Sequence, residues 1–153
     1  MLFYLFYYRD LSHNHLAQIP SELLLRTPRL FKLKLGHNRI SEVPSGAFIH
    51  LKDLGFLDLS KNKIEILRPA AFTGLQRLVI LLLQNNQFSS LPNGTFTNMT
   101  YLKYLDLSRN RIAVIQRHHF DNLNDLSFLN LAYNPLREVE EKAFFTTPNL
   151  KYL

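Results

Sequence analysis

Residues 105–112 have the sequence LDLSRNRI, and this segment decides the fold of the chain. Leu105 and Leu107 alternate with polar residues, which predicts a short strand with one buried face. Asn110 breaks the alternation, and Ile112 follows it two positions later. Asn is a poor strand residue and costs free energy when it is buried without hydrogen-bond partners. Its place between apolar residues therefore needs a structural reason.

The reason is a repeat that runs through the chain. Asparagine recurs every 24 residues without an insertion, at Asn14, Asn38, Asn62, Asn86, Asn110 and Asn134. We number the units one to six by these asparagines, and we call the residues at one position in successive units a column. Apolar columns lie eight, five and three residues before the Asn and two, five and ten residues after it. One such unit cannot bury its own leucines, so the units are expected to stack into a solenoid.

The Asn column is expected to lie inside this solenoid, where each strand ends and the chain turns back. An amide side chain carries two N–H donors and an acceptor oxygen. It can therefore satisfy backbone groups that a tight turn leaves unpaired. We expect the six asparagines to form a polar ladder between layers of leucine.

The pattern LxxLxLxxNxL with this period resembles the leucine-rich repeat family. A Phe ten residues after the Asn, at Phe48, Phe72, Phe96, Phe120 and Phe144, is similar to the subtype of Toll-like receptors, Slit-like proteins and neuronal adhesion receptors. The resemblance implies an α/β-type repeat solenoid, a right-handed coil with a parallel concave β-sheet and mostly irregular or short 3₁₀ convex segments. We expect residues 1–153 to form a single array whose Phe column is a buried stack.

The two ends of the chain depart from the pattern. Arg9 lies in a column that is otherwise Leu, Leu24 replaces the Phe of the first unit, and a partial seventh unit begins at residue 150. Residues 1–10, MLFYLFYYRD, lack the basic start and cleavage site of a signal peptide, so they are interpreted as part of the fold, with Phe6 eight residues before Asn14. Neither end shows the polar cap that terminal units need. The sequence predicts a fragment of a longer ectodomain, with a complete short protein as the alternative.

The column six residues before the Asn indicates a binding surface. It reads Tyr8, Lys32, Phe56, Ile80, Tyr104 and Phe128. The outward face of a half-solvated sheet is normally polar, and aromatic residues are enriched in the centres of interfaces. Stabilisation of the sheet by neighbouring aromatic side chains is the alternative explanation.

Charged residues lie beside this column, four residues and one residue before the Asn. Lys34 can pair with Asp10 or Asp58, although exposed pairs contribute only about 0–1 kcal/mol and serve partner specificity better than stability. A solvated charged face is the alternative. The predicted partner-binding surface comprises Tyr8, Lys32, Lys34, Phe56, Asp58, Lys61, Ile80, Tyr104, Asp106, Arg109, Phe128 and Tyr133.

The sequence offers no set of residues for catalysis, a cofactor or a metal. His13 and His37 share a column but lack the third ligand that a metal site needs. His118 and His119 are interpreted as a surface pair. The net charge of +6 is spread along the sequence, which disfavours a nucleic-acid ligand because such binding requires a clustered basic stripe. No apolar run reaches the about 20 residues that span a bilayer.

Two sequons, NGT at Asn93 and NMT at Asn98, lie in the return segment of the fourth unit, away from the predicted sheet. Chance occurrence in an Asn-rich chain is the alternative. With the resemblance, they indicate an extracellular or cell-surface protein without enzymatic activity. We expect a protein ligand or co-receptor to bind the concave face. Two alternatives remain, namely pattern recognition of a non-protein ligand and a structural, matrix-type role, and the oligomeric state is not predicted.

Overall fold

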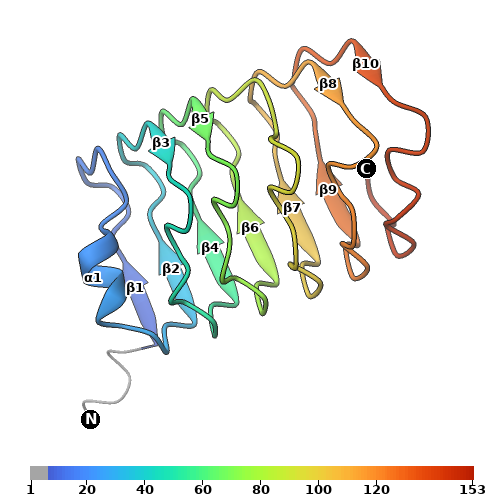
Figure 1. Cartoon of the computed structure of the whole chain (residues 1–153). Coiled ribbons are helices and arrows are strands. Elements are labelled where there is room, and N and C mark those ends of the chain that lie inside the picture. Colours follow the sequence, from blue (N-terminus) through green and yellow to red (C-terminus); the bar gives the residue numbers. More distant parts are fainter. Residues whose placement is uncertain (1–6) are drawn as a thin grey trace.

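The computed structural model describes residues 7–153, which form a coil with one short strand per unit on a common sheet (Figure 1). The expectations for Phe6 and for the rest of residues 1–6 lie outside the described residues. No helix in the described part of the chain has the length and apolarity needed to cross a membrane.

The main sheet is parallel, and its strands lie in sequence order. They are β1 (Tyr8–Asp10), β2 (Lys32–Lys34), β4 (Phe56–Asp58), β6 (Ile80–Leu82), β7 (Tyr104–Asp106) and β9 (Phe128–Asn130). Each residue pairs with the one 24 positions later, as Leu81 does with Leu105. Tyr152 forms a further bridge to Phe128, so the partial seventh unit continues the sheet. The predicted parallel sheet is confirmed, because an unbroken period keeps every strand in the same register.

The return segments consist mainly of consecutive turns, as expected. In the second unit the N–H groups of Ile49, Leu51 and Leu54 each bond to a carbonyl three residues earlier. The first unit instead contains a short helix, α1 (Ser21–Leu25). Four further strands form two pairs along a second edge of the coil (Figure 1), β3 (Glu42–Val43) with β5 (Ile66–Leu67) and β8 (Val114–Ile115) with β10 (Glu138–Val139). These strands were not expected from the sequence, and the first and fourth units lack one.

The interior is filled by the apolar columns. Leucines of the inner units, such as Leu57, Leu81 and Leu105, are completely buried. The Phe column forms the expected stack, with ring centroids 6.1 Å apart between Phe48 and Phe72 and between Phe72 and Phe96. Phe120 and Phe144 extend this stack with centroid separations of 6.2 and 5.8 Å. Phe144 at the end of this stack is only half-buried.

The Asn column lies inside the coil and also joins neighbouring units. Asn62 Nδ2 donates to the carbonyl oxygens of Leu59 in its own unit and of Leu35 in the preceding unit, both at 3.0 Å. Its Oδ1 accepts the backbone N–H of Ile40 at 3.0 Å. Each inner Asn is buried and repeats the two donated bonds. The ladder therefore holds the turns of the coil together as well as satisfying their backbone groups.

The ladder has one gap, at the fourth unit. Asn110 donates to the carbonyls of Leu83 and Leu107 at 3.0 Å, but its buried Oδ1 has no partner among the described residues. The N–H that should reach it belongs to Phe88, the one aromatic residue in a column of Ile and Leu. The same unit lacks the second strand, so its backbone departs from that of its neighbours.

Candidate ligand-binding surfaces

The residues six positions before each Asn lie on the face of the main sheet that points away from the core, which we call the concave face. Tyr8 is exposed, and the other members of this aromatic column are half-buried. Tyr104 and Phe128 stack with centroids 4.2 Å apart and an interplanar angle of 3°. Lys32 Nζ lies 4.5 Å from the ring centroid of Phe56 and 5.6 Å from that of Tyr8. These side chains therefore support one another across the strands while part of their surface stays open.

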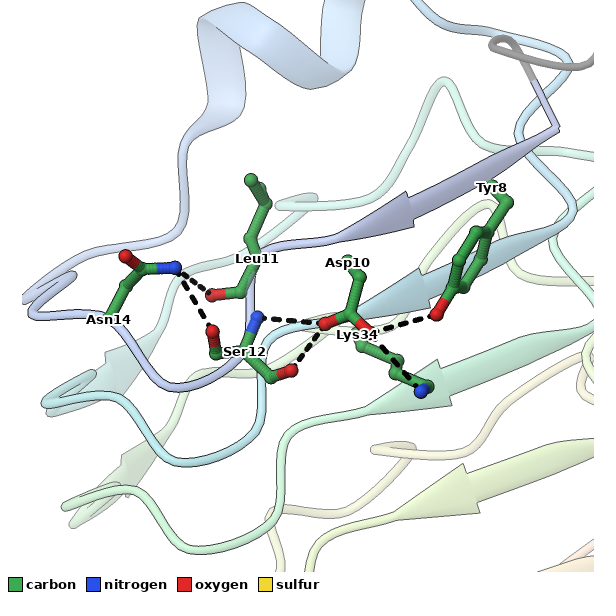
Figure 2. A network of polar contacts seen from close by, with 6 residues as sticks. All are labelled: Tyr8, Asp10, Leu11, Ser12, Asn14 and Lys34. Carbon is green, nitrogen blue, oxygen red and sulfur yellow. Dashed lines mark hydrogen bonds and ion pairs between the residues drawn. The ribbon is translucent and has the colours of Figure 1, made fainter.

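A polar network fixes the start of this face (Figure 2). The Asp10 carboxylate accepts hydrogen bonds from Ser12 Oγ and N, from Tyr8 Oη at 2.8 Å and from Lys34 Nζ at 3.2 Å. These donors, above all the Ser12 hydroxyl, hold the pKa of Asp10 well below its usual value, although partial burial opposes them. Tyr8 and Asp10 raise the pKa of Lys34. Of the two partners predicted for Lys34, the structure pairs it with Asp10, and Lys34 remains charged at neutral pH.

The carboxylates of the inner units also shape the turns. Asp58 Oδ1 accepts the backbone N–H of Ser60 at 2.8 Å, and Asp106 Oδ1 accepts that of Ser108 at 2.9 Å. Asp106 is buried. Burial of the Tyr104 ring, together with the negative charge of Asp106, raises the pKa of Tyr104. Of the two, Asp58 is the more accessible to a partner. This role was not predicted, although the recurring Asp-Leu-Ser of the first, third and fifth units is a sequence signal for it.

The column directly before the Asn adopts a left-handed backbone. The φ angles of His13, His37, Lys61, Asn85, Arg109 and Tyr133 lie between 53° and 57°. This turn directs the Asn inward and leaves its neighbours on the outside. The rings of His13 and His37 stack at 4.0 Å, and the Arg109 guanidinium lies 4.1 Å from the Tyr133 ring. Partial burial, His13 and Lys61 lower the pKa of His37.

Side chains directly before and directly after the Asn form one basic strip along the ends of the main strands. It comprises the cations Arg39, Lys61, Lys63, Arg109 and Arg111, the histidines His13, His15 and His37, and the amides Asn85 and Gln87. The five cations and three histidines are exposed, and neither column contains a carboxylate. These cations are spread along the sequence, but they lie close together on the surface of the coil. The fixed period brings charges that are far apart in sequence onto one line.

A groove lies at the opposite ends of the same strands. It has a volume of about 740 Å³ and is lined by Tyr7, Arg29, Phe31, Asp53, Arg77 and Tyr101. The Arg77 guanidinium pairs with Asp53 at 2.8 Å. These residues were not among the predicted site residues. Their columns, nine and seven residues before the Asn, have no uniform chemistry that could have identified them.

The adjacent histidines in the fifth return segment have different environments. His118 is exposed and its Nδ1 lies 2.8 Å from Asp121 Oδ2, whereas His119 is buried, so the predicted surface pair is correct only for His118. His119 Nδ1 accepts the Gln116 N–H at 3.2 Å, and its Nε2 lies 3.1 Å from Gln116 Oε1. Burial lowers the pKa of His119, although Glu140 opposes this effect.

The two sequons lie on the surface of the coil. Asn93 and Asn98 are exposed in the turns of the fourth return segment. Within residues 7–153 no three His, Asp or Glu side chains gather as a metal site would require. The rings of His13 and His37 instead stack on one another.

Comparison with known proteins places this architecture in a family. The family model described as "Leucine rich repeat" matches residues 10–64, 28–88 and 76–136, which together are more than half of the chain. The solved structure titled "Crystal structure of TLR13-ssRNA13 complex" is 27% identical with a TM-score of 0.77. That match covers 92% of this chain and 24% of the other, so the present chain spans about a quarter of its length. No curated protein matches significantly. The chain belongs to the leucine-rich repeat family.

Proposed function

We propose that this chain is a non-catalytic recognition module of an extracellular or cell-surface protein, and that it binds a protein ligand or co-receptor on its concave face. The observation that carries the proposal is the aromatic column. Tyr104 and Phe128 are already stacked before any partner arrives, so little side-chain entropy remains to be lost on binding. Tyr and Phe are also residues that interface centres favour.

The side chains around the column supply specificity in this proposal. Lys32 and Lys34 sit among the aromatic residues of the first three units, and Asp58 follows on the next strand. Ile80 continues the apolar surface between Phe56 and Tyr104. Lys61, Arg109 and Tyr133 border it at the strand ends, where polar contacts set the orientation of a partner more than its affinity. Asp106 contributes mainly through the turn that it holds.

The two sequons fit the same setting. We propose that Asn93 and Asn98 carry N-linked glycans when the protein passes through a secretory compartment. Both side chains are exposed on a return segment, on the side of the unit away from the main sheet. Glycans at these positions leave the concave face open. The likeness to a receptor-type structure, TLR13, supports an extracellular setting.

The proposal is tested with a triple variant, Phe56→Ser, Tyr104→Ser and Phe128→Ser. Wild-type protein is screened against an array of purified secreted and cell-surface ectodomains, and each partner found is titrated against the variant. We expect binding to fall by about a hundredfold or more, because three interface aromatic residues are removed. The matched control is Ile49→Ser, Ile66→Ser and Phe145→Ser, which removes exposed apolar residues of the return side.

Equal loss in both triple variants, or full binding by the concave variant with an unchanged circular dichroism spectrum, would refute the concave site. Absence of any partner in the array would instead favour the structural, matrix-type role. The outcomes with the two variants test where the binding site lies, and the screen tests whether the protein binds an ectodomain at all.

A second candidate ligand is a single-stranded nucleic acid on the same face. The printed title of the TLR13 structure names ssRNA13, and Lys32 lies over aromatic rings, an arrangement that nucleic-acid surfaces use for phosphates and stacked bases. Binding of this type falls steeply as salt is raised, because counterions are released. Titration of a uridine oligonucleotide at two salt concentrations distinguishes it from a protein ligand.

A further inference from the structure

We propose that the basic strip binds a linear sulfated polysaccharide, as a second surface that adjoins the concave face and shares Lys61 and Arg109 with its border. The net positive charge of the chain is concentrated in the strip. The chain has 18 basic and 12 acidic residues, and five of the basic residues lie in the strip without an acid. The remaining 13 basic and 12 acidic residues nearly cancel. The strip therefore carries almost the whole net charge of +6.

The cations of the strip are available to a ligand. The ion pairs of the described residues join Lys34 to Asp10, Arg68 to Glu42, Arg77 to Asp53 and His118 to Asp121. None of these pairs involves a residue of the strip, and its five cations are exposed. Lys61 and Lys63 lie on either side of Asn62, and Arg109 and Arg111 on either side of Asn110. Each of these pairs presents two charges at one turn.

The backbone fixes this arrangement. The left-handed turn and the bonded Asn repeat with the strand spacing, which is about 4.8 Å between neighbouring strands. Arg111 Nη2 donates to Gln87 Oε1 at 2.8 Å, and Arg109 lies on the Tyr133 ring, so both guanidinium groups are held in place. A row of fixed positive charges matches a ligand whose anions repeat along a line.

The chemistry between the cations favours a polysaccharide over a nucleic acid. Surfaces for single-stranded nucleic acids combine cations with aromatic side chains that stack on bases. The strip has no aromatic side chain from Arg39 to Arg111. The stacked rings of His13 and His37 lie at one end of it, and Tyr133, next to its other end, faces Arg109. The fourth unit contributes Asn85 and Gln87, whose amides can hydrogen-bond to sugar hydroxyl groups. Sulfate groups would contact the cations on both sides of them.

The test uses a heparin-derived decasaccharide and isothermal titration calorimetry at near-physiological salt. The strip variant carries Lys61→Gln, Lys63→Gln, Arg109→Gln and Arg111→Gln. The control variant carries Arg29→Gln, Lys52→Gln, Lys103→Gln and Lys142→Gln, which removes the same net charge from exposed positions elsewhere and includes one residue with positive φ. We expect affinity to fall by about tenfold or more in the strip variant and by less than about twofold in the control, with a weaker salt dependence only in the former.

Three outcomes would overturn the inference. One is undetectable binding of the decasaccharide by the wild-type protein, and another is an equal loss in both charge variants, which would indicate a general charge effect. The third is tighter binding of a uridine oligonucleotide than of the decasaccharide, which would make the strip a nucleic-acid site. The concave triple variant is expected to bind the decasaccharide normally, so failure here is distinguishable from failure of the proposed protein-binding function.

Discussion

The buried asparagines make different numbers of hydrogen bonds in different units. Asn62 donates to two carbonyls and accepts one N–H, whereas Asn110 donates to two carbonyls and its Oδ1 accepts nothing within the described chain. We predict that Asn62→Leu lowers the free energy of unfolding by about 2–4 kcal/mol, and Asn110→Leu by about 1–3 kcal/mol, since the first change leaves one more buried backbone group unpaired. Urea denaturation followed by circular dichroism measures both values.

Asn14→Leu is the control for this comparison. Asn14 is exposed, and within the described residues it bonds only to the nearby carbonyls of Leu11 and Ser12. Water can replace these bonds, so we expect a much smaller loss of stability. A larger loss for Asn110→Leu than for Asn62→Leu would show that the missing acceptor bond has no energetic weight.

A buried imidazole makes stability depend on pH. His119 is held neutral, with Nδ1 accepting the Gln116 N–H, and its pKa in the folded state is lowered mainly by burial. The unfolded chain therefore binds the proton more readily, and stability rises with pH through this range. We predict that the urea midpoint of unfolding decreases as the pH is lowered from about 7.5 to about 5.5, because the pKa of His119 in the unfolded chain lies near 6.5.

The contribution of His119 is isolated with His119→Gln, whose fall in midpoint over the same range should be smaller than that of the wild type. His37 also has a lowered pKa and acts in the same direction, so part of the dependence should persist. An identical pH profile for wild type and variant would assign the effect to other groups.

At the scale of elements, the close contact between neighbouring return segments sets strict limits on side chains. Gly74 has a φ of +100°, and a Cβ there would lie 2.6 Å from the backbone of Ile49 in the preceding unit. A Cβ on Gly55 would also meet an atom at 2.6 Å, but that atom belongs to the exposed Phe31 ring. We predict that Gly74→Ala lowers the free energy of unfolding by about 1–3 kcal/mol, because the packed backbone must shift.

Gly55→Ala serves as the matched variant, and it should cost much less because the Phe31 side chain can rotate away. Both are measured by thermal unfolding under identical conditions. Equal destabilisation by the two substitutions would mean that the backbone of the return segments shifts more easily than its close contacts indicate.

The main elements were predictable from the sequence and the lesser ones were not. Every main strand after β1 has the same alternation as Leu105 and Leu107, which indicates one buried face directly. The strands β3, β5, β8 and β10 have only two residues each, too few for any periodicity to appear. They exist because stacking brings neighbouring backbones into register. The fourth unit lacks such a strand, and Phe88 in place of Ile or Leu is the nearest sequence signal.

At the scale of the whole molecule, the candidate surfaces arise because the period never changes. The aromatic column could be predicted, since its members repeat one chemical type. The basic strip could not, because its cations occupy two columns that also contain His, Asn, Gln, Tyr and Pro. Their separation in sequence obscures a proximity that only the coil creates.

The sequence by itself determined the period, the parallel sheet, the buried leucine and phenylalanine columns and the inward Asn ladder, because each depends on one residue type repeated at one position. The tertiary structure decided what depends on contacts between units. These contacts are the hydrogen bonds from Asn62 to the preceding turn, the pairing of Asp10 with Lys34, the burial of His119 and the alignment of the basic strip. A repeat in sequence fixes which residues share a column. Only the stacked chain brings the neighbouring columns together and sets their exposure to solvent.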